Sequence, residues 1–211
     1  MMLLIFPASG EKETKYVALT FDDGPSGRFT RRLLVGLEQR EVKATFFLCG
    51  YRLADYKSLA KKIHDQGHEI GLHGYSHDPM SDMSESQVTG EIQKTAALLP
   101  CDVRFLRPPG GKYNEATIAA ARKAGLAILS WSLDPKDWAC DDAATITERV
   151  VKKVKDGDVI LLHDMSDSSV TAALRIVDRL EARGFRFVTV SELAKIKGVI
   201  LTPGKVYTGF P

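Results

Sequence analysis

Short apolar segments alternate with longer segments of helical periodicity along almost the whole chain. In the first apolar run, Val17, Leu19 and Phe21 alternate with smaller or polar residues before the turn-forming pair Gly24-Pro25, which is typical of a strand. The apolar segments predict seven strands, at Tyr16–Phe21, Ala44–Leu48, Glu69–Leu72, Val103–Leu106, Leu126–Leu133, Val159–Leu162 and Phe185–Val188. The amphipathic segments between them predict helices at Arg31–Glu38, Lys57–Gln66, Glu85–Leu99, Glu115–Ala124, Ala144–Lys155 and Val170–Ala182.

Strands that alternate with helices are typical of a parallel sheet with crossover helices. We therefore expect an α/β fold whose sheet is either open or closed into a barrel. The chain has 211 residues, of which 44% are hydrophobic and 27% charged, a size that suits one well-buried domain. We expect the residues after Lys197 to form a loose tail.

Charge and cysteine content exclude some classes of protein. The net charge is +2, and the Lys and Arg residues are scattered, so no nucleic-acid-binding face is predicted. The three cysteines, Cys49, Cys101 and Cys140, match no zinc-finger spacing and are expected to be buried free thiols. No transmembrane helix is predicted, and the apolar stretch at residues 2–6 is too short for the core of a signal peptide.

Polar residues that could bind a metal or take part in catalysis follow five of the seven predicted strands. In a parallel α/β fold the carboxyl ends of the strands share one face of the molecule, where such folds build their sites. These residues are Asp22 and Asp23 after the first strand, His73 after the third, Arg107 after the fourth, Asp134 and Asp137 after the fifth, and His163 after the sixth. We expect a functional site on this face.

Asp22 and Asp23 are adjacent carboxylates, which repel each other unless a cation or a buried donor lies between them. Neighbouring side chains on a regular strand face opposite ways, so both can serve one site only if the chain bends, which Gly24 permits. A metal ion is the simplest partner for the pair. A solvated Asp-Asp-Gly turn is the alternative.

His73 and His77 lie four residues apart directly after a strand, so a helical turn or a tight loop could bring them together. With one carboxylate they would bind a divalent ion on one side and leave positions open for water and substrate. Two surface histidines at this spacing are the alternative when the pair is taken alone.

Three further segments allow a functional or a structural interpretation. Arg107-Pro108-Pro109-Gly110-Gly111 is either a proline turn with a surface arginine or an extended segment whose glycine amides approach a ligand. His163 is either a buried, hydrogen-bonded histidine or an acid that protonates a leaving group. Trp138 either lines a pocket or caps the barrel.

Five segments taken together resemble the polysaccharide deacetylases of the NodB homology family, carbohydrate esterase family 4. They are Thr20–Pro25, His73–His77, Arg107–Gly111, Asp134–Trp138 and Leu161–His163. The resemblance implies a polysaccharide deacetylase domain at residues 15–197, between an N-terminal segment at 1–14 and a C-terminal tail at 198–211. It also implies a distorted (β/α) barrel of seven or eight strands and metal-dependent removal of acetyl groups from a peptidoglycan or chitin-like glycan.

The resemblance implies a role for each matching residue. The metal ligands would be Asp23, His73 and His77. Asp22 would be the general base, steadied by Arg107, and His163 the acid, oriented by Asp137. The Gly110 amide would stabilise the oxyanion, and Trp138 and Leu161 would contact the substrate. Two positions depart from the family pattern, because Gly74 replaces the usual Ser or Thr and Gly110 the usual aromatic residue.

The resemblance also implies one divalent metal ion, with zinc expected first and cobalt, manganese or nickel as alternatives. The partner would be an N-acetylated glycan, the chain is assumed to be a monomer, and an extracellular or cell-wall location is expected. Two other functions remain open: a catalytically silent glycan-binding module of the same fold, and another mononuclear metal enzyme such as an iron oxygenase, since two histidines and a carboxylate also suit non-haem iron.

Overall fold

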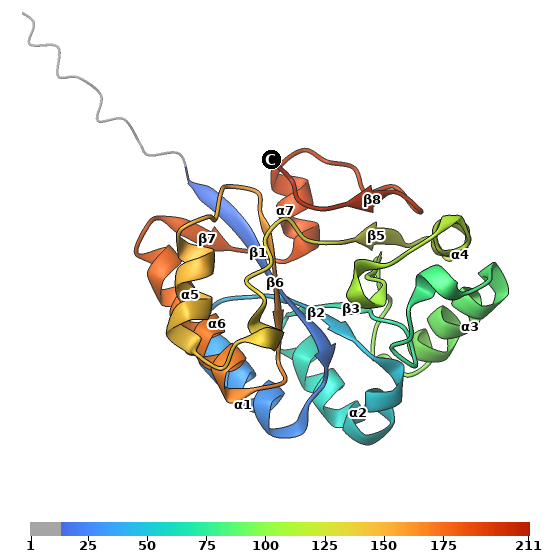
Figure 1. The fold of residues 1–211 in the computed structure, drawn as a ribbon, viewed down its shortest axis with the longest axis horizontal. Coiled ribbons are helices and arrows are strands. Elements are labelled where there is room, and N and C mark those ends of the chain that lie inside the picture. Colours follow the sequence, from blue (N-terminus) through green and yellow to red (C-terminus); the bar gives the residue numbers. More distant parts are fainter. Residues whose placement is uncertain (1–13) are drawn as a thin grey trace, which may run out of the picture.

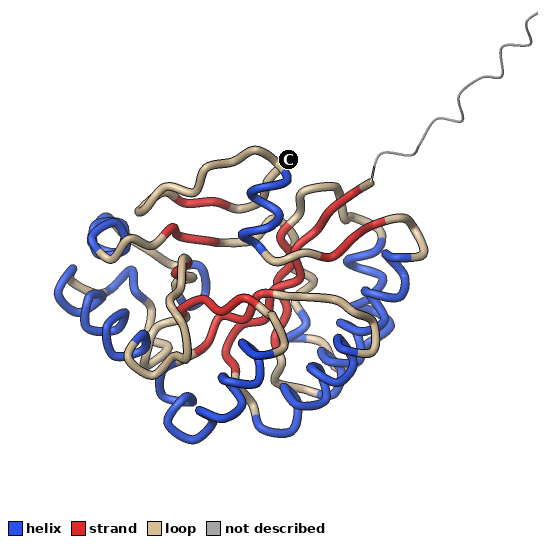
Figure 2. Tube along the Cα trace, turned by 180° about the vertical axis from the view of Figure 1, so that it is seen from behind, coloured by secondary structure: helices blue, strands red, loops and turns tan. Residues whose placement is uncertain are grey.

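The computed structural model describes residues 14–211, which form a curled sheet of parallel strands with helices packed around its outer side (Figures 1 and 2). The strands are β1 (Lys15–Gly24), β2 (Thr45–Leu48), β3 (Glu69–Leu72), β4 (Phe105–Leu106), β5 (Ala127–Leu129), β6 (Val159–His163), β7 (Phe185–Phe187) and β8 (Val206–Tyr207). The helices are α1 (Gly27–Glu38), α2 (Gly50–Asp65), α3 (Glu85–Ala96), α4 (Glu115–Lys123), α5 (Ala143–Val151), α6 (Asp167–Glu181) and α7 (Val190–Ile196). The N-terminal segment expected at 1–14 lies almost entirely outside the described residues.

The sheet has the strand order β6-β1-β2-β3-β4-β5-β8, and β7 pairs with β1. All strand pairs are parallel. The path of paired strands ends at β6 and β8, which do not pair as strands, and isolated bridges join Leu133 to Ile160 and Asp158 to Gly209. The structure thus confirms the predicted α/β fold as a distorted, incompletely closed barrel.

The β1–β6 pair does most to position the site. Its register places Ala18 beside Val159 and continues to Asp22 beside His163. Because β1 is central and buried, Val17, Leu19 and Phe21 pack with the core that helices α1, α2 and α6 share with the sheet. The two site residues at the strand ends therefore rest on a rigid base.

The expected loose tail after Lys197 is wrong. Val206–Tyr207 forms β8, which pairs with β5, and Phe210 is 1% exposed in a cluster with Phe47 and Phe105. The Phe210 amide donates to the Gly157 carbonyl at 2.8 Å. Burial of two aromatic side chains fixes this segment to the barrel although it carries many turn-forming residues.

Several element boundaries and one expectation about the cysteines also differ from the structure. The strand expected at Leu126–Leu133 ends at Leu129, because the chain turns there toward the site. Helix α2 begins seven residues before the predicted start and has a kink at Tyr56, which hid its periodicity. Of the cysteines, all three are free as expected, but only Cys49 is buried.

No helix in residues 14–211 is long and apolar enough to span a bilayer.

Candidate active site and metal centre

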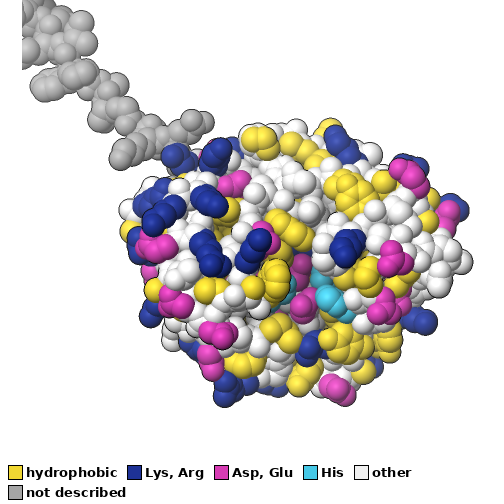
Figure 3. All heavy atoms as spheres, viewed as in Figure 1, with side chains coloured by type: hydrophobic (Ala, Val, Ile, Leu, Met, Phe, Trp, Pro, Cys, Tyr) yellow, Lys and Arg dark blue, Asp and Glu magenta, His cyan; other side chains and the backbone are white. Residues whose placement is uncertain are grey.

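A cavity of about 340 Å³ opens at the carboxyl ends of the strands. Histidine and acidic side chains lie side by side in a hollow on this face of the molecule (Figure 3). The residues that line the cavity are Asp22, Asp23, His73, His77, Gly110, Trp131, Asp134, Trp138, Leu161 and His163. Residues from separate strand ends therefore share one cavity, as the sequence predicts.

The bend that brings both aspartates into the cavity lies at Asp23 itself. Its φ is +69°, a left-handed conformation that is unusual for a residue other than glycine, and the β1–β2 register shifts between Phe21 and Gly24. Gly24 instead allows close approach, since a Cβ there would lie 2.7 Å from Oδ1 of Asp164. The expected bend exists, but Asp23 makes it rather than Gly24.

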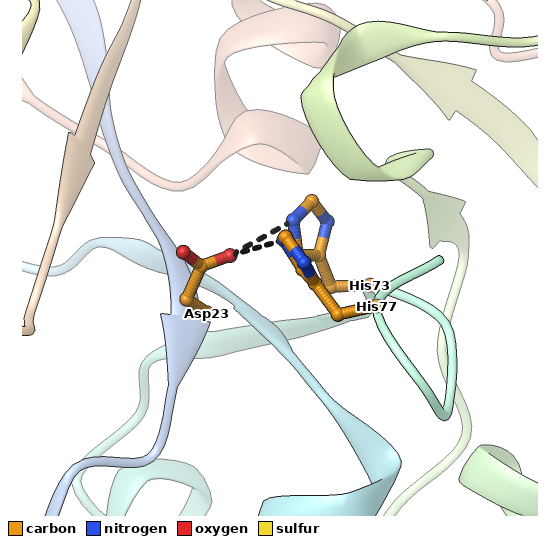
Figure 4. Close-up of side chains that lie close together, drawn as sticks. All are labelled: Asp23, His73 and His77. Carbon is orange, nitrogen blue, oxygen red and sulfur yellow. Dashed lines mark ion pairs between the residues drawn. The ribbon is translucent and has the colours of Figure 1, made fainter. Parts of the chain in front are cut away.

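Asp23, His73 and His77 converge (Figure 4). Oδ1 of Asp23 lies 3.2 Å from Nε2 of His73 and 2.9 Å from Nε2 of His77, and the ligand atoms all lie within 4.8 Å of one another. Oδ1 is buried and makes no aligned hydrogen bond. A buried carboxylate oxygen faced by two imidazole nitrogens is the donor set of a divalent cation, so the residues fit the metal that the resemblance implies.

The second ring nitrogen of His73 explains how this ligand is held. Nδ1 lies 2.7 Å from the carbonyl oxygen of Arg107, which leaves Nε2 directed at Asp23. His73 is 2% exposed, whereas the His77 side chain is 41% exposed and its backbone has a φ of +70°. His73 is therefore fixed within the barrel, and His77 is presented by a loop.

The charges in this group are strongly coupled. Burial alone would raise the pKa of Asp23, but the two imidazoles outweigh it and hold the pKa well below its usual range. The Asp23 carboxylate in turn raises the pKa of His77, against the effect of partial burial. The site thus attracts positive charge.

Arg107 is fully buried and connects Asp22 to three other groups. Its Nη1 donates to Asp22 Oδ1 at 2.6 Å and to the Thr20 hydroxyl at 2.8 Å. Nε donates to the Leu129 carbonyl at 3.1 Å and Nη2 to the Ser130 carbonyl at 2.8 Å. Because Nη1 of Arg107 occupies Asp22 Oδ1, the other oxygen of Asp22 faces the ligand group, with Oδ2 3.7 Å from Nε2 of His73.

His163 lines the cavity and is held from behind by the buried carboxylate of Asp137. Asp137 is 2% exposed and accepts from both the backbone amide and the ring Nδ1 of His163, each at 2.8 Å. Burial alone would lower the pKa of His163, but the carboxylates, chiefly Asp137, raise it to about 9. Nδ1 is thus occupied, and Nε2 is the ring nitrogen that can exchange a proton in the cavity.

Comparison with known proteins places the chain in a family. The family model described as polysaccharide deacetylase matches residues 9–129. The chain is 38% identical over 191 residues to a peptidoglycan-N-acetylglucosamine deacetylase from Bacillus cereus, which covers 87% of this chain and 90% of the relative. The chain belongs to the polysaccharide deacetylase family.

Solved structures of the polysaccharide deacetylase family share the fold. A family 4 acetyl xylan esterase from Clostridium thermocellum, solved in complex with a cobalt ion, has a TM-score of 0.87 at 33% identity, over 93% of this chain and all of that chain (100%). A CE4 family pseudoenzyme from Bacillus anthracis has a TM-score of 0.80 at 28% identity, over 86% of this chain and 66% of that chain. The solved structures similar to this chain therefore include both an acetyl xylan esterase and a pseudoenzyme.

The residues expected to contact substrate also line this cavity. Gly110, Trp138 and Leu161 line the cavity, and Trp138 is 66% exposed. Gly110 has a φ of +60°, and a Cβ there would meet no atom within 4 Å. The missing aromatic side chain thus leaves open space beside the ligands.

Asp134, expected on this face, lines the cavity, whereas sequence reasoning missed two other residues of the site. Thr20 accepts a hydrogen bond from Arg107, and Trp131 lines the cavity. Thr20 lies within the segment Thr20–Pro25, so its position beside Asp22 was the available signal. Trp131 lies within the strand expected at Leu126–Leu133. Because that strand ends at Leu129, Trp131 follows β5, as the catalytic candidates follow other strands.

Proposed function

We propose that the chain hydrolyses the N-acetyl groups of an N-acetylated glycan with the help of one divalent cation, releasing acetate and leaving a free amino sugar. The observation that supports this most directly is the single cavity that contains a three-residue ligand group, a carboxylate and a histidine with a raised pKa. Metal-assisted amide hydrolysis needs a cation site, a base for water and an acid for the leaving amine. Residues suited to all three tasks line this one cavity.

A divalent cation held by Asp23, His73 and His77 would supply Lewis-acid chemistry, polarising the acetamide carbonyl and lowering the pKa of a water molecule. Asp22 accepts the proton of the attacking water on Oδ2, because Oδ1 is engaged by Arg107. The ion pair fixes the carboxylate in one orientation, so its free oxygen needs no rearrangement before it accepts the proton.

His163 gives its proton from Nε2 to the departing nitrogen as the carbon–nitrogen bond breaks. Asp137 holds the ring by Nδ1 and by the backbone amide, which sets the orientation that the transfer requires. The Gly110 amide lies at the cavity wall and would donate to the oxyanion. One proton of the water goes to Asp22 and the other stays on the acyl product, which leaves as acetic acid and ionises to acetate, while the amino sugar carries the proton from His163. Exchange with solvent then removes the proton from Asp22 and restores one to His163.

We propose peptidoglycan or a chitin-like polymer as the substrate and zinc as the first metal to test. The Bacillus cereus relative supports an N-acetylglucosamine substrate, and the cobalt-bound esterase supports a divalent ion at this kind of site. The esterase also makes acetylated xylan a necessary comparison, since the same residues could hydrolyse an acetyl ester.

The test measures acetate and free amine released from chitin oligomers, peptidoglycan and acetylated xylan in parallel. Each substrate is assayed with metal-depleted protein and with zinc, cobalt, manganese or nickel restored. The proposal predicts equal amounts of acetate and amine from an N-acetylated glycan, only with metal and without oxygen consumption. Binding of a glycan without acetate release would instead assign the chain to the silent module, and oxygen uptake would assign it to an oxygenase.

A further inference from the structure

We propose that Glu91 of helix α3 is a positioning residue that fixes the loop His73–His77 and thereby sets the affinity of the cation site. This inference rests on the proposed cation site and goes beyond it, because Glu91 contacts none of the three ligands. It lies fourteen residues beyond His77 on a different element of the fold.

One oxygen of Glu91 accepts three hydrogen bonds from the loop. Oε2 accepts from the Tyr75 amide at 2.6 Å, from the Ser76 amide at 2.8 Å and from the Ser76 hydroxyl at 3.1 Å. Hydrogen bonds to a charged acceptor are roughly twice as strong as those between neutral groups. The carboxylate thus holds two successive amides of the segment that joins the two histidine ligands.

The opposite side of the loop is held by the start of helix α2. The Gly50 amide donates to the Gly74 carbonyl at 2.9 Å, and the Tyr51 amide donates to the Tyr75 carbonyl at 2.9 Å. The loop is therefore fixed through its carbonyls by α2 and through its amides by Glu91. Removing Glu91 would release one of the two sides.

His77 depends on this loop more than His73 does. His73 follows β3 directly and is held through Nδ1 by the Arg107 carbonyl. Within residues 14–211, by contrast, the His77 ring makes its polar contact with Asp23 only. The backbone of the loop must therefore place this ligand.

Gly74 adds to the importance of Glu91. It has a φ of +77° and no side chain that could brace the loop, and a Cβ there would lie 3.4 Å from Oε2 of Glu91. The Glu91 carboxylate lies directly against the glycine and supplies the bracing contacts of the loop. Removal of a group that hydrogen-bonds a metal ligand typically lowers metal affinity about 10- to 100-fold, and we expect a loss of this size when the loop that carries His77 is released.

The test compares the dissociation constant for cobalt in wild type, Glu91→Ala, Glu91→Asp and Glu91→Gln, by competition with a coloured chelator. Gln93→Ala is the matched control, because Gln93 is an exposed residue of the same helix. We expect about 10- to 100-fold weaker binding for the alanine variant. The aspartate variant should also bind more weakly, because its shorter side chain withdraws the acceptor. The glutamine variant keeps an acceptor oxygen but loses the charge, so its affinity should lie between those of wild type and the alanine variant.

The visible spectrum of the bound cobalt and the acetate release give two further readouts. A displaced His77 should alter the cobalt absorption bands of Glu91→Ala, and added cobalt should recover part of its acetate release. The inference would be overturned if Glu91→Ala bound cobalt as tightly as wild type. If the alanine variant does not fold, the same criterion applies to Glu91→Asp. Failure of the wild type itself to bind cobalt would instead refute the proposed function.

Discussion

The Arg107 guanidinium and the Asp22 carboxylate form a buried ion pair, with Nη1 2.6 Å from Oδ1. The guanidinium also lies over the Phe47 ring, with 4.0 Å between its central carbon and the ring centroid. Arg107 thus links the hydrophobic interior of the barrel to the carboxylate that faces the ligands. The pair supports the site by geometry, and its removal should affect folding as well as chemistry.

Replacement of Arg107 by alanine should lower the free energy of unfolding by about 3–5 kcal/mol, because it leaves a buried carboxylate without its partner. Arg107→Lys should also be destabilised, since one ammonium cannot contact Asp22, Thr20 and two carbonyls at once. Urea denaturation followed by circular dichroism checks this. An alanine variant as stable as wild type would show that the pair contributes nothing to the fold.

Asp22→Asn should lower acetate release by about 10²- to 10⁴-fold, because the amide cannot accept the proton of the attacking water. Cation binding should persist, since Asp22 is not among the three proposed ligands. Acetate release and metal content measured on one preparation separate the two effects. A variant that deacetylates a glycan at the wild-type rate would remove Asp22 from the role of base.

The pH dependence of turnover should report His163. Its pKa is raised to about 9, so the acid form is present below that pH and is lost as pH rises through it. A bound cation adds positive charge nearby, which lowers this pKa, and we expect the alkaline limb of kcat at or below about 9. Asp137→Asn removes the main charge that offsets the effect of burial on His163, so the alkaline limb of kcat should move to lower pH. An alkaline limb at the same pH as in wild type would contradict the pairing of Asp137 with His163.

Most of the fold could be predicted from the sequence because strand and helix periodicities alternate so regularly. The site could be predicted because parallel strands end on one face, so polar residues at those ends had to converge. The positive φ of Asp23 was not predictable, since the bend depends on tertiary contacts rather than on local propensity. The same holds for Glu91, which reads along the chain as an ordinary acidic residue of an amphipathic helix.

The C-terminal segment shows a different limit of the sequence. Val206–Tyr207 is too short for a recognisable periodicity and lies among Thr, Pro and Gly residues, so nothing local distinguishes it from a tail. Its place in the sheet comes from pairing with β5, more than seventy residues away, and from the burial of Phe210. Long-range burial of this kind has no counterpart in a local pattern.

Phe210→Ala should lower the free energy of unfolding by about 3–5 kcal/mol, because it empties a buried aromatic position in the barrel interior. Thr208→Ala is the matched control, since Thr208 is exposed in the same segment. Thermal unfolding of both variants tests whether residues 198–211 belong to the domain. Equal stability of the two variants would restore the interpretation of a loose tail.

The central claim is that Asp23, His73 and His77 hold a cation that glycan deacetylation requires. The most direct measurement determines bound metal per chain and acetate release from chitin oligomers in the same samples, for wild type and His77→Ala, during stepwise addition of zinc to metal-depleted protein. We predict that acetate release by wild type rises in proportion to bound zinc and saturates near one ion per chain, with both quantities reduced in His77→Ala. Acetate release at full rate from metal-free protein, or saturation with zinc without any acetate release, would contradict the claim.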